Sequence, residues 1–303
     1  MDRVEPSLNS MAPDHIKKEM STMLLGSIFA MNLFVLLVPE NYRTEVSGWL
    51  VIVCSAAVVA ISAAILYRQR FEGLFGRAYG SIAIGLILWF VAEMTSVVYR
   101  ILGLTGQSAT VLSYPMTMIT DVFWLAGYGF FAYFLLRIMF LFIHSIKPRV
   151  LILITAATAF IVLILSQSIS YFFYDLQAAQ TFPGAVASTF LVANDDFSRF
   201  VKIEQPILDI ILILPSMVIL SALKDGKLTA TPWLLLSSAL LVLAVQDIGN
   251  IYFSVLYDIH NHWVWKMFAI AGYLCIAASL FWYNRFFIFD SKRALRSWQE
   301  GNR

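Results

Sequence analysis

The chain has 303 residues, of which 60% are hydrophobic and 13% are charged, and its formal net charge is +2. A soluble globular domain carries about 25% charged residues, so this composition and a mean hydropathy of +0.77 exclude an ordinary soluble protein. Many hydrophobic runs reach the roughly 20 residues that a helix needs to cross a bilayer. They do not alternate in segments of about 10 residues, as the strands of a membrane β-barrel do. We therefore predict an all-α membrane protein.

The hydropathy pattern predicts about eight transmembrane helices joined by short linkers. The one long linker, residues 174–205, is polar and contains Pro183 and Gly184. The predicted spans are, in chain order, 21–39, 47–67, 78–99, 116–143, 150–173, 206–223, 230–257 and 263–286.

The distribution of Lys and Arg predicts the orientation of these spans. If the N-terminus is cytoplasmic, 14 Lys and Arg residues fall in cytoplasmic segments and 4 in outside segments, which gather acidic residues instead. Lys and Arg favour the cytoplasmic side of a membrane. We therefore expect a multi-pass protein of the plasma membrane with both termini in the cytoplasm and an external loop at 174–205.

The two halves of the chain resemble each other in sequence. Residues 85–99 (GLILWFVAEMTSVVY) align with residues 239–253 (ALLVLAVQDIGNIYF), which places Glu93 opposite Asp247. This alignment pairs the third predicted span with the seventh. It indicates an internal repeat of four helices.

A second alignment extends the repeat to the fourth and eighth spans. Residues 121–135 align with residues 266–280 and share the tripeptide Ala-Gly-Tyr. Because four crossings return the chain to the same side, such repeats are parallel rather than inverted. We predict two four-helix membrane repeats, residues 21–145 and 146–288. The remaining parts are a cytoplasmic N-terminal segment, residues 1–20, and a cytoplasmic C-terminal tail, residues 289–303.

Short motifs follow one another in a particular order between residues 80 and 290. They read WFVAEMTSVVY (89–99), SYP (113–115), TDVFWLAGYGFF (120–131), QPILDIILIL (205–214), AVQDIGNIYF (244–253) and AGYLCIAASL (271–280). Together they resemble the multi-pass membrane sensory domain found ahead of some archaeal and bacterial histidine kinases and diguanylate cyclases. One departure is Lys266, because that family usually has Asp at this place in the last helix.

The resemblance implies a sensory module that reads an external small molecule. No kinase or cyclase domain follows the last predicted span in this sequence, so we expect a module without its own output domain. Its signal would then pass to a separate signalling protein or through a homo-oligomer. Two alternatives stay open, which are a transporter of a small cation or amine and a structural or assembly protein of the membrane.

Ionisable side chains inside the predicted spans gather in one layer, near the outer ends of the helices. Such residues are costly in lipid and therefore face the bundle interior or a water-filled cavity. Aromatic and polar side chains accompany them at helical spacing, which predicts an outward-facing, acidic and aromatic cup. The candidate ligand-binding residues are Glu93, Asp121, Asp247, Lys266, Trp89, Trp124, Tyr128, Tyr273, Asn250 and Asp209.

Simpler interpretations exist for the residues near the span ends. Asp121, Asp209 and Lys266 are placed so that each also fits an interfacial or paired structural role, and Lys side chains extend to water readily. If the cup exists, Lys266 needs an acid within about 4 Å. We expect Glu93 or Asp247 to be that acid.

The sequence lacks the motifs of common enzymes. It contains no G-x-S-x-G, H-E-x-x-H, P-loop or G-x-G-x-x-G pattern and has four His residues in all; these patterns carry nucleophilic, zinc and phosphate chemistry. It also lacks the dense Lys and Arg runs of nucleic-acid-binding proteins. We expect a non-enzyme with no catalytic residues, no metal, no cofactor and no nucleic-acid partner, surrounded by the lipid bilayer.

Overall fold

The computed structural model describes residues 14–69, 73–101, 113–161, 196–223, 231–256 and 262–285. These residues are almost entirely helical. The helices are α1 (Asp14–Leu37), α2 (Glu40–Gln69), α3 (Gly73–Ile101), α4 (Ser113–Phe142), a helix over Pro148–Ile161, α7 (Asp196–Leu223), α8 (Thr231–Leu256) and α9 (His262–Tyr283). A short 3-10 helix, η2 (Ile143–Ser145), follows α4. Each of the eight predicted spans overlaps one of the α-helices.

Several helices begin earlier than the hydropathy pattern predicted. α2 starts at Glu40, α3 at Gly73 and α7 at Asp196, so the last part of the loop predicted at 174–205 is helical. Residues 174–195 lie outside the described residues. The reason for the difference is that backbone hydrogen bonds continue a helix into polar residues, whereas hydropathy detects only the stretch that fits the hydrocarbon core.

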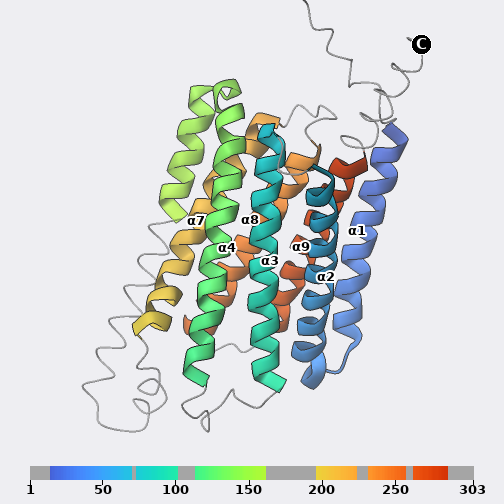
Figure 1. The fold of residues 1–303 in the computed structure, drawn as a ribbon, viewed down its shortest axis with the longest axis vertical. Helices are drawn as coiled ribbons and strands as arrows, with labels where there is room; N and C mark the ends of the chain where they lie inside the picture. Colours follow the sequence, from blue (N-terminus) through green and yellow to red (C-terminus); the bar gives the residue numbers. More distant parts are fainter. Residues whose placement is uncertain are drawn as a thin grey trace, which may run out of the picture.

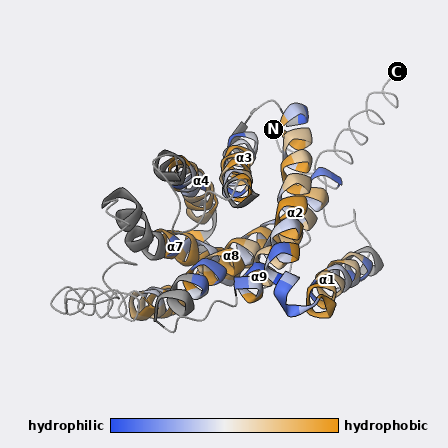
Figure 2. Ribbon diagram, turned by 90° about the horizontal axis from the view of Figure 1, so that it is seen from below, coloured by the Kyte–Doolittle hydropathy of each residue, from blue (hydrophilic) through white to orange (hydrophobic). Residues whose placement is uncertain are grey.

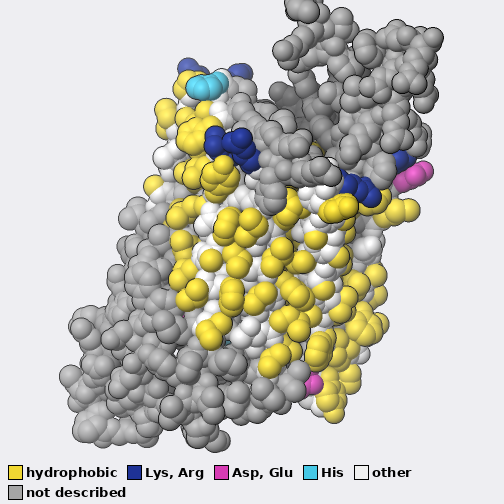
Figure 3. All heavy atoms as spheres, viewed as in Figure 1, with side chains coloured by type: hydrophobic (Ala, Val, Ile, Leu, Met, Phe, Trp, Pro, Cys, Tyr) yellow, Lys and Arg dark blue, Asp and Glu magenta, His cyan; other side chains and the backbone are white. Residues whose placement is uncertain are grey.

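The described helices have the length and surface of a membrane protein. Six of them, α1, α2, α3, α4, α8 and α9, are long and apolar enough to cross a bilayer, and Pro148–Ile161 and Leu208–Leu223 are shorter apolar segments. Hydrophobic side chains cover the middle of the face in Figure 3, and Lys and Arg side chains lie near its upper end. An exposed apolar surface of this extent is unfavourable in water. The structure thus confirms the predicted all-α membrane protein.

Helices α2, α3, α4, α7, α8 and α9 form a closed ring. Each packs against the next in this order, and α9 packs back against α2. The helices run side by side along the long axis of the molecule (Figure 1), and the view from below shows α3 and α4 across from α8 and α9 (Figure 2). One half of the ring therefore consists of α2, α3 and α4, and the other half of α7, α8 and α9. The contacts α4–α7 and α9–α2 join the two halves.

Helix α1 lies outside the ring, where it packs mainly against α9. Its end is held by Arg43, which donates hydrogen bonds to the carbonyl oxygens of Val38 at 2.9 Å and Leu36 at 3.1 Å. Carbonyl groups at a helix C-terminus lack partners within the helix, and a cation there is favourable. The Arg43 guanidinium also lies 5.1 Å from the ring centre of Trp263. Arg43 thus links the turn between α1 and α2 to α9.

A glycine allows α3 and α4 to approach each other closely. A Cβ atom at Gly127 would overlap the indole ring of Trp89 and lie 3.3 Å from the carbonyl oxygen of Gly85. The Trp89 indole N–H donates a hydrogen bond to the carbonyl oxygen of Trp124 at 3.2 Å. Small residues at such contacts are a common basis of helix packing in membranes.

The pair α8 and α9 is packed in the same way. A Cβ atom at Gly272 would lie 2.8 Å from the Leu243 side chain and 3.4 Å from the carbonyl oxygen of Ala239. The Ser279 hydroxyl donates a hydrogen bond to the carbonyl oxygen of Pro232 at 2.7 Å. Glycine thus brings the helices together in both halves of the ring.

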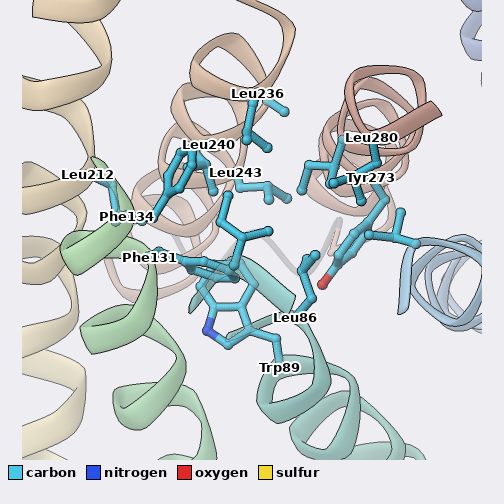
Figure 4. Packing of buried hydrophobic residues seen from close by; sticks show 14 of the residues in the cluster. Leu86, Trp89, Phe131, Phe134, Leu212, Leu236, Leu240, Leu243, Tyr273 and Leu280 are labelled. Carbon is cyan, nitrogen blue, oxygen red and sulfur yellow. The ribbon is translucent and has the colours of Figure 1, made fainter. Parts of the chain in front are cut away.

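Apolar side chains fill the middle of the ring. Figure 4 shows side chains from α3, α4, α7, α8 and α9 directed toward one another. The buried ring of Trp89 lies 4.7 Å from that of Phe131 and 5.2 Å from that of Tyr128, both in edge-on arrangements. Such arrangements are favourable for aromatic rings. The core therefore holds Trp89 in one orientation.

We predict that Gly127→Ala destabilises the protein, because the added methyl group must displace the Trp89 ring or separate α3 from α4. Overpacking of this kind costs about 1–3 kcal/mol. The matched control is Gly129→Ala on the same helix, where a Cβ atom meets open space. Thermal unfolding in detergent should show a lower Tm for Gly127→Ala only. An equal Tm for both variants would contradict the close packing.

Candidate functional site

A partly open cavity of about 730 Å³ lies at one end of the ring. Its walls come from the N-terminal parts of α2, α4 and α9 and from the C-terminal parts of α3 and α8, which meet at the same end of the bundle. We call it the outer cavity. Its charged and aromatic lining residues are Glu45, Glu93, Asp121, Asp247, His262, Lys266, Trp124 and Trp265.

The structure brings six of the ten predicted site residues together around this cavity. They are Glu93, Asp121, Trp124, Asp247, Asn250 and Lys266. They come from α3, α4, α8 and α9, so residues more than 150 positions apart in sequence share one wall. Their role in binding a ligand stays a prediction.

The other four predicted site residues lie deeper. Trp89, Tyr128, Asp209 and Tyr273 are buried and do not line the outer cavity. Trp89, Tyr128 and Tyr273 lie about one helical turn further from the open end than Glu93, Trp124 and Ala269 on the same helices, and Asp209 lies on α7, of which no described residue lines the cavity. The helical spacing identified the correct faces of α3, α4 and α9, but it could not tell how deep the cavity reaches.

One wall of the cavity was not predicted from the sequence. Asn41, Thr44, Glu45 and Gly48 line the cavity from the first three turns of α2. These positions are spaced three, four and seven residues from the first, which places them on one face of a helix. That spacing was visible in the sequence, but these residues precede or only begin the span predicted at 47–67.

The start of α9 is anchored to the end of α8 beside the cavity. A hydrogen bond of 3.0 Å joins His262 Nδ1 to the side-chain oxygen of Asn250. The Trp265 ring lies close against α8 at Gly249, where an added Cβ atom would overlap the ring. The Trp265 ring also stacks on Phe268 at 5.7 Å. These contacts hold an indole ring in the cavity wall.

Lys266 extends across the cavity wall toward α2. Its ammonium group donates a hydrogen bond to the carbonyl oxygen of Thr44 at 3.1 Å, and the side chain lines the cavity. The ion pair expected between Lys266 and Glu93 or Asp247 stays a prediction.

The outer cavity has an excess of acidic groups. Among the described residues, four carboxyl groups face it, from Glu45, Glu93, Asp121 and Asp247, against one ammonium group, that of Lys266. Charges of one sign in a cleft with low-dielectric walls concentrate ions of the opposite sign. The arrangement therefore favours a cation over an anion.

Beneath the cavity, a tyrosine hydroxyl joins two carboxyl groups. The Tyr128 hydroxyl lies 2.6 Å from Asp209 Oδ1 and 2.8 Å from Asp247 Oδ2. We call these three residues the carboxyl triad. They connect α4, α7 and α8, and Asp247 belongs to the triad and to the cavity wall.

No protein-family model, no curated protein and no solved structure matches this chain. The resemblance to the membrane domain of sensory kinases and cyclases thus stays a prediction.

We predict that Lys266→Met lowers the stability of the protein. The substitution removes the ammonium group that faces the cavity acids and breaks its hydrogen bond to the Thr44 carbonyl, which keeps the Ser47 hydroxyl as a donor. A hydrogen bond from a charged group contributes about 1.5–3 kcal/mol. Adding Glu93→Gln or Asp247→Asn should recover part of the loss, as measured by unfolding in mixed micelles. The control is Lys147→Met, an exposed residue at the other end of the bundle. If neither acid substitution recovers stability, Lys266 does not depend on Glu93 or Asp247.

Proposed function

We propose that this chain is a multi-pass membrane sensory or ligand-binding module that binds a small organic cation in the outer cavity. The observation that carries the proposal is the gathering of four carboxyl groups and two indole rings around one cavity of about 730 Å³. Sites for small molecules commonly have volumes of about 300–1,000 Å³. An anion would meet repulsion from the acids.

The aromatic residues support an organic cation rather than a metal ion. Trp124 and Trp265 both line the cavity, and the face of an indole ring attracts ammonium groups at short range. Trp265 is held against α8, and the Trp124 ring lies 5.0 Å from the buried Trp89 ring. Two rings held in place beside carboxyl groups suit an amine or quaternary ammonium ligand.

The filled core supports a binding module over a transporter. Trp89, Leu243 and Tyr273 lie inward of the cavity and are at most 2% exposed, with values of 1%, 1% and 2%. A ligand in the cavity therefore meets packed side chains on the inner side. A transporter of a small cation or amine, the main alternative, would need these side chains to separate during each cycle.

We also propose eight crossings arranged as two parallel four-helix repeats. Gly127 lies against the Trp89 side chain and near the Gly85 carbonyl oxygen. Gly272, its counterpart in the second half, lies against the Leu243 side chain and near the Ala239 carbonyl oxygen. The sequence alignment pairs each of these residues with its counterpart in the other half. The ring contacts α4–α7 and α9–α2 occupy equivalent places in such an arrangement.

The remaining parts of the proposal rest on the sequence. The excess of Lys and Arg at the end opposite the cavity supports a plasma-membrane protein with both termini in the cytoplasm and the cavity outside. The resemblance to sensory membrane domains supports signalling through a separate protein or a homo-oligomer.

We predict that purified protein binds tetramethylammonium, choline or putrescine. Binding should raise the Tm, and titration calorimetry should show that Glu93→Gln or Asp121→Asn weakens the affinity about tenfold, which corresponds to about 1.4 kcal/mol. The matched control is Glu40→Gln, an exposed acid at the same end that does not line the cavity.

Two results would oppose the proposal. If Glu40→Gln weakens the binding of the probe as much as Glu93→Gln does, the binding site lies outside the outer cavity. Uptake of a bound probe into proteoliposomes would assign the chain to the transporter class.

The proposed orientation is tested by labelling single cysteines in cells. In a background where Cys54 and Cys275 are replaced by Ala, we expect an impermeant thiol reagent to label Tyr42→Cys but not Lys147→Cys. Both positions are exposed and they lie at opposite ends of the bundle. The reverse labelling pattern would place the outer cavity on the cytoplasmic side.

A further inference from the structure

The carboxyl triad lies in a dry part of the protein. The exposed fractions of its side chains are 3% for Tyr128, 0% for Asp209 and 3% for Asp247. The distances from the Tyr128 hydroxyl oxygen, 2.6 Å to Asp209 and 2.8 Å to Asp247, are those of hydrogen bonds between oxygen atoms. Each contact therefore needs a proton between its two oxygens.

The protons available in the triad can be counted. A tyrosine hydroxyl carries one proton and donates one hydrogen bond, and an ionised carboxylate only accepts. If Asp209 and Asp247 were both ionised, one of the two contacts would bring oxygen lone pairs together without a proton. The geometry thus requires a second proton, which one of the carboxyl groups must carry.

The surroundings assign this proton to Asp209. Its second oxygen, Oδ2, is buried and has no hydrogen-bond partner among the described residues. A buried ionised group without full hydrogen bonding is strongly unfavourable, and a neutral carboxyl group tolerates the missing partner better. Asp247 instead reaches the outer cavity, where water can stabilise its charge.

We infer that the carboxyl triad is a proton-binding site in which Asp209 carries the proton. The Asp209 carboxyl donates to the Tyr128 hydroxyl oxygen, and the Tyr128 hydroxyl donates to the ionised Asp247. In this arrangement the Asp209 proton lies in one of the two short contacts and the Tyr128 hydroxyl proton lies in the other.

The nearby charged groups favour the same protonation state. Among the described residues, the acids that line the cavity outnumber its one lysine, so a second negative charge in the triad would meet repulsion. The titratable and charged groups on the elements packed around the triad are Glu45 and Cys54 on α2, Glu93 on α3, Asp121 on α4, and His262, Lys266 and Tyr273 on α9. On α7, the side chains of residues 196–207 lie outside the described part of the chain.

The site links the charge in the cavity to a proton held between helices of both halves of the ring. Asp247 faces the cavity, and Tyr128 and Asp209 extend the link to α4 and α7. A change of charge beside Asp247 therefore changes the free energy with which Asp209 binds its proton. This inference goes beyond the proposed function and holds whether or not the cavity binds an organic cation.

Infrared spectroscopy of the purified full chain at neutral pH tests the inference. We expect a carbonyl stretching band of a protonated carboxyl group, which is lost in Asp209→Asn and retained in the control variants Glu93→Gln and Asp121→Asn. The assignment does not depend on this variant alone, since labelling wild-type protein with carbon-13 aspartate should shift the band even if the variant does not fold. The absence of the band, its survival in Asp209→Asn or its failure to shift would overturn the inference.

The stability of the protein provides a second readout. If the folded state holds one proton that the unfolded state releases at neutral pH, the ratio of folded to unfolded protein falls tenfold for each unit that the pH rises. Asp209→Asn removes this contribution, so wild-type stability should decline more steeply with pH than that of the variant. Equal slopes for the two proteins in mixed micelles would show that Asp209 is ionised in the folded state and would overturn the inference.

Discussion

The close approach of α3 and α4 at Gly127 is the contact on which the end of the bundle that holds the cavity depends. Because Gly127 has no side chain, the Trp89 indole occupies the space beside it. The indole in turn donates to the backbone of α4 at Trp124. The residue after Gly127 is Tyr128, whose hydroxyl reaches α7 and α8. A wider separation of α3 and α4 would disturb the orientation of α4 and with it both hydrogen bonds of this hydroxyl.

Acidic side chains in and beneath the outer cavity are stabilised in two different ways. Glu93, Asp121 and Asp247 face a cavity that admits water, so they keep part of their hydration. Asp209 is fully buried and depends on Tyr128. The lipid around the ring offers neither water nor polar partners, so each acid needs one of these two solutions. An acid that lines the cavity is hydrated, whereas an acid buried beneath it needs a hydrogen-bond partner from the protein.

The residues of the cavity wall illustrate what helical spacing predicts and what it leaves open. Glu93 and Trp89 are four residues apart on one face of α3, and both were expected in the cup. The structure places Glu93 in the wall and Trp89 in the core, because aromatic rings of α4 pack against Trp89. Glu45 was missed, since it lies before the apolar stretch that defined the span of α2.

The sequence by itself determined that the chain is an all-α membrane protein and where most of its helices lie. Those properties follow from the local composition and length of apolar segments, which the hydrocarbon core of the bilayer selects directly. Only the tertiary structure decided that α4 lies beside α7, that α2 supplies a cavity wall, and that Tyr128 bridges Asp209 and Asp247. These contacts join residues far apart in the chain, and they depend on how closely the helices pack, which local sequence patterns do not encode.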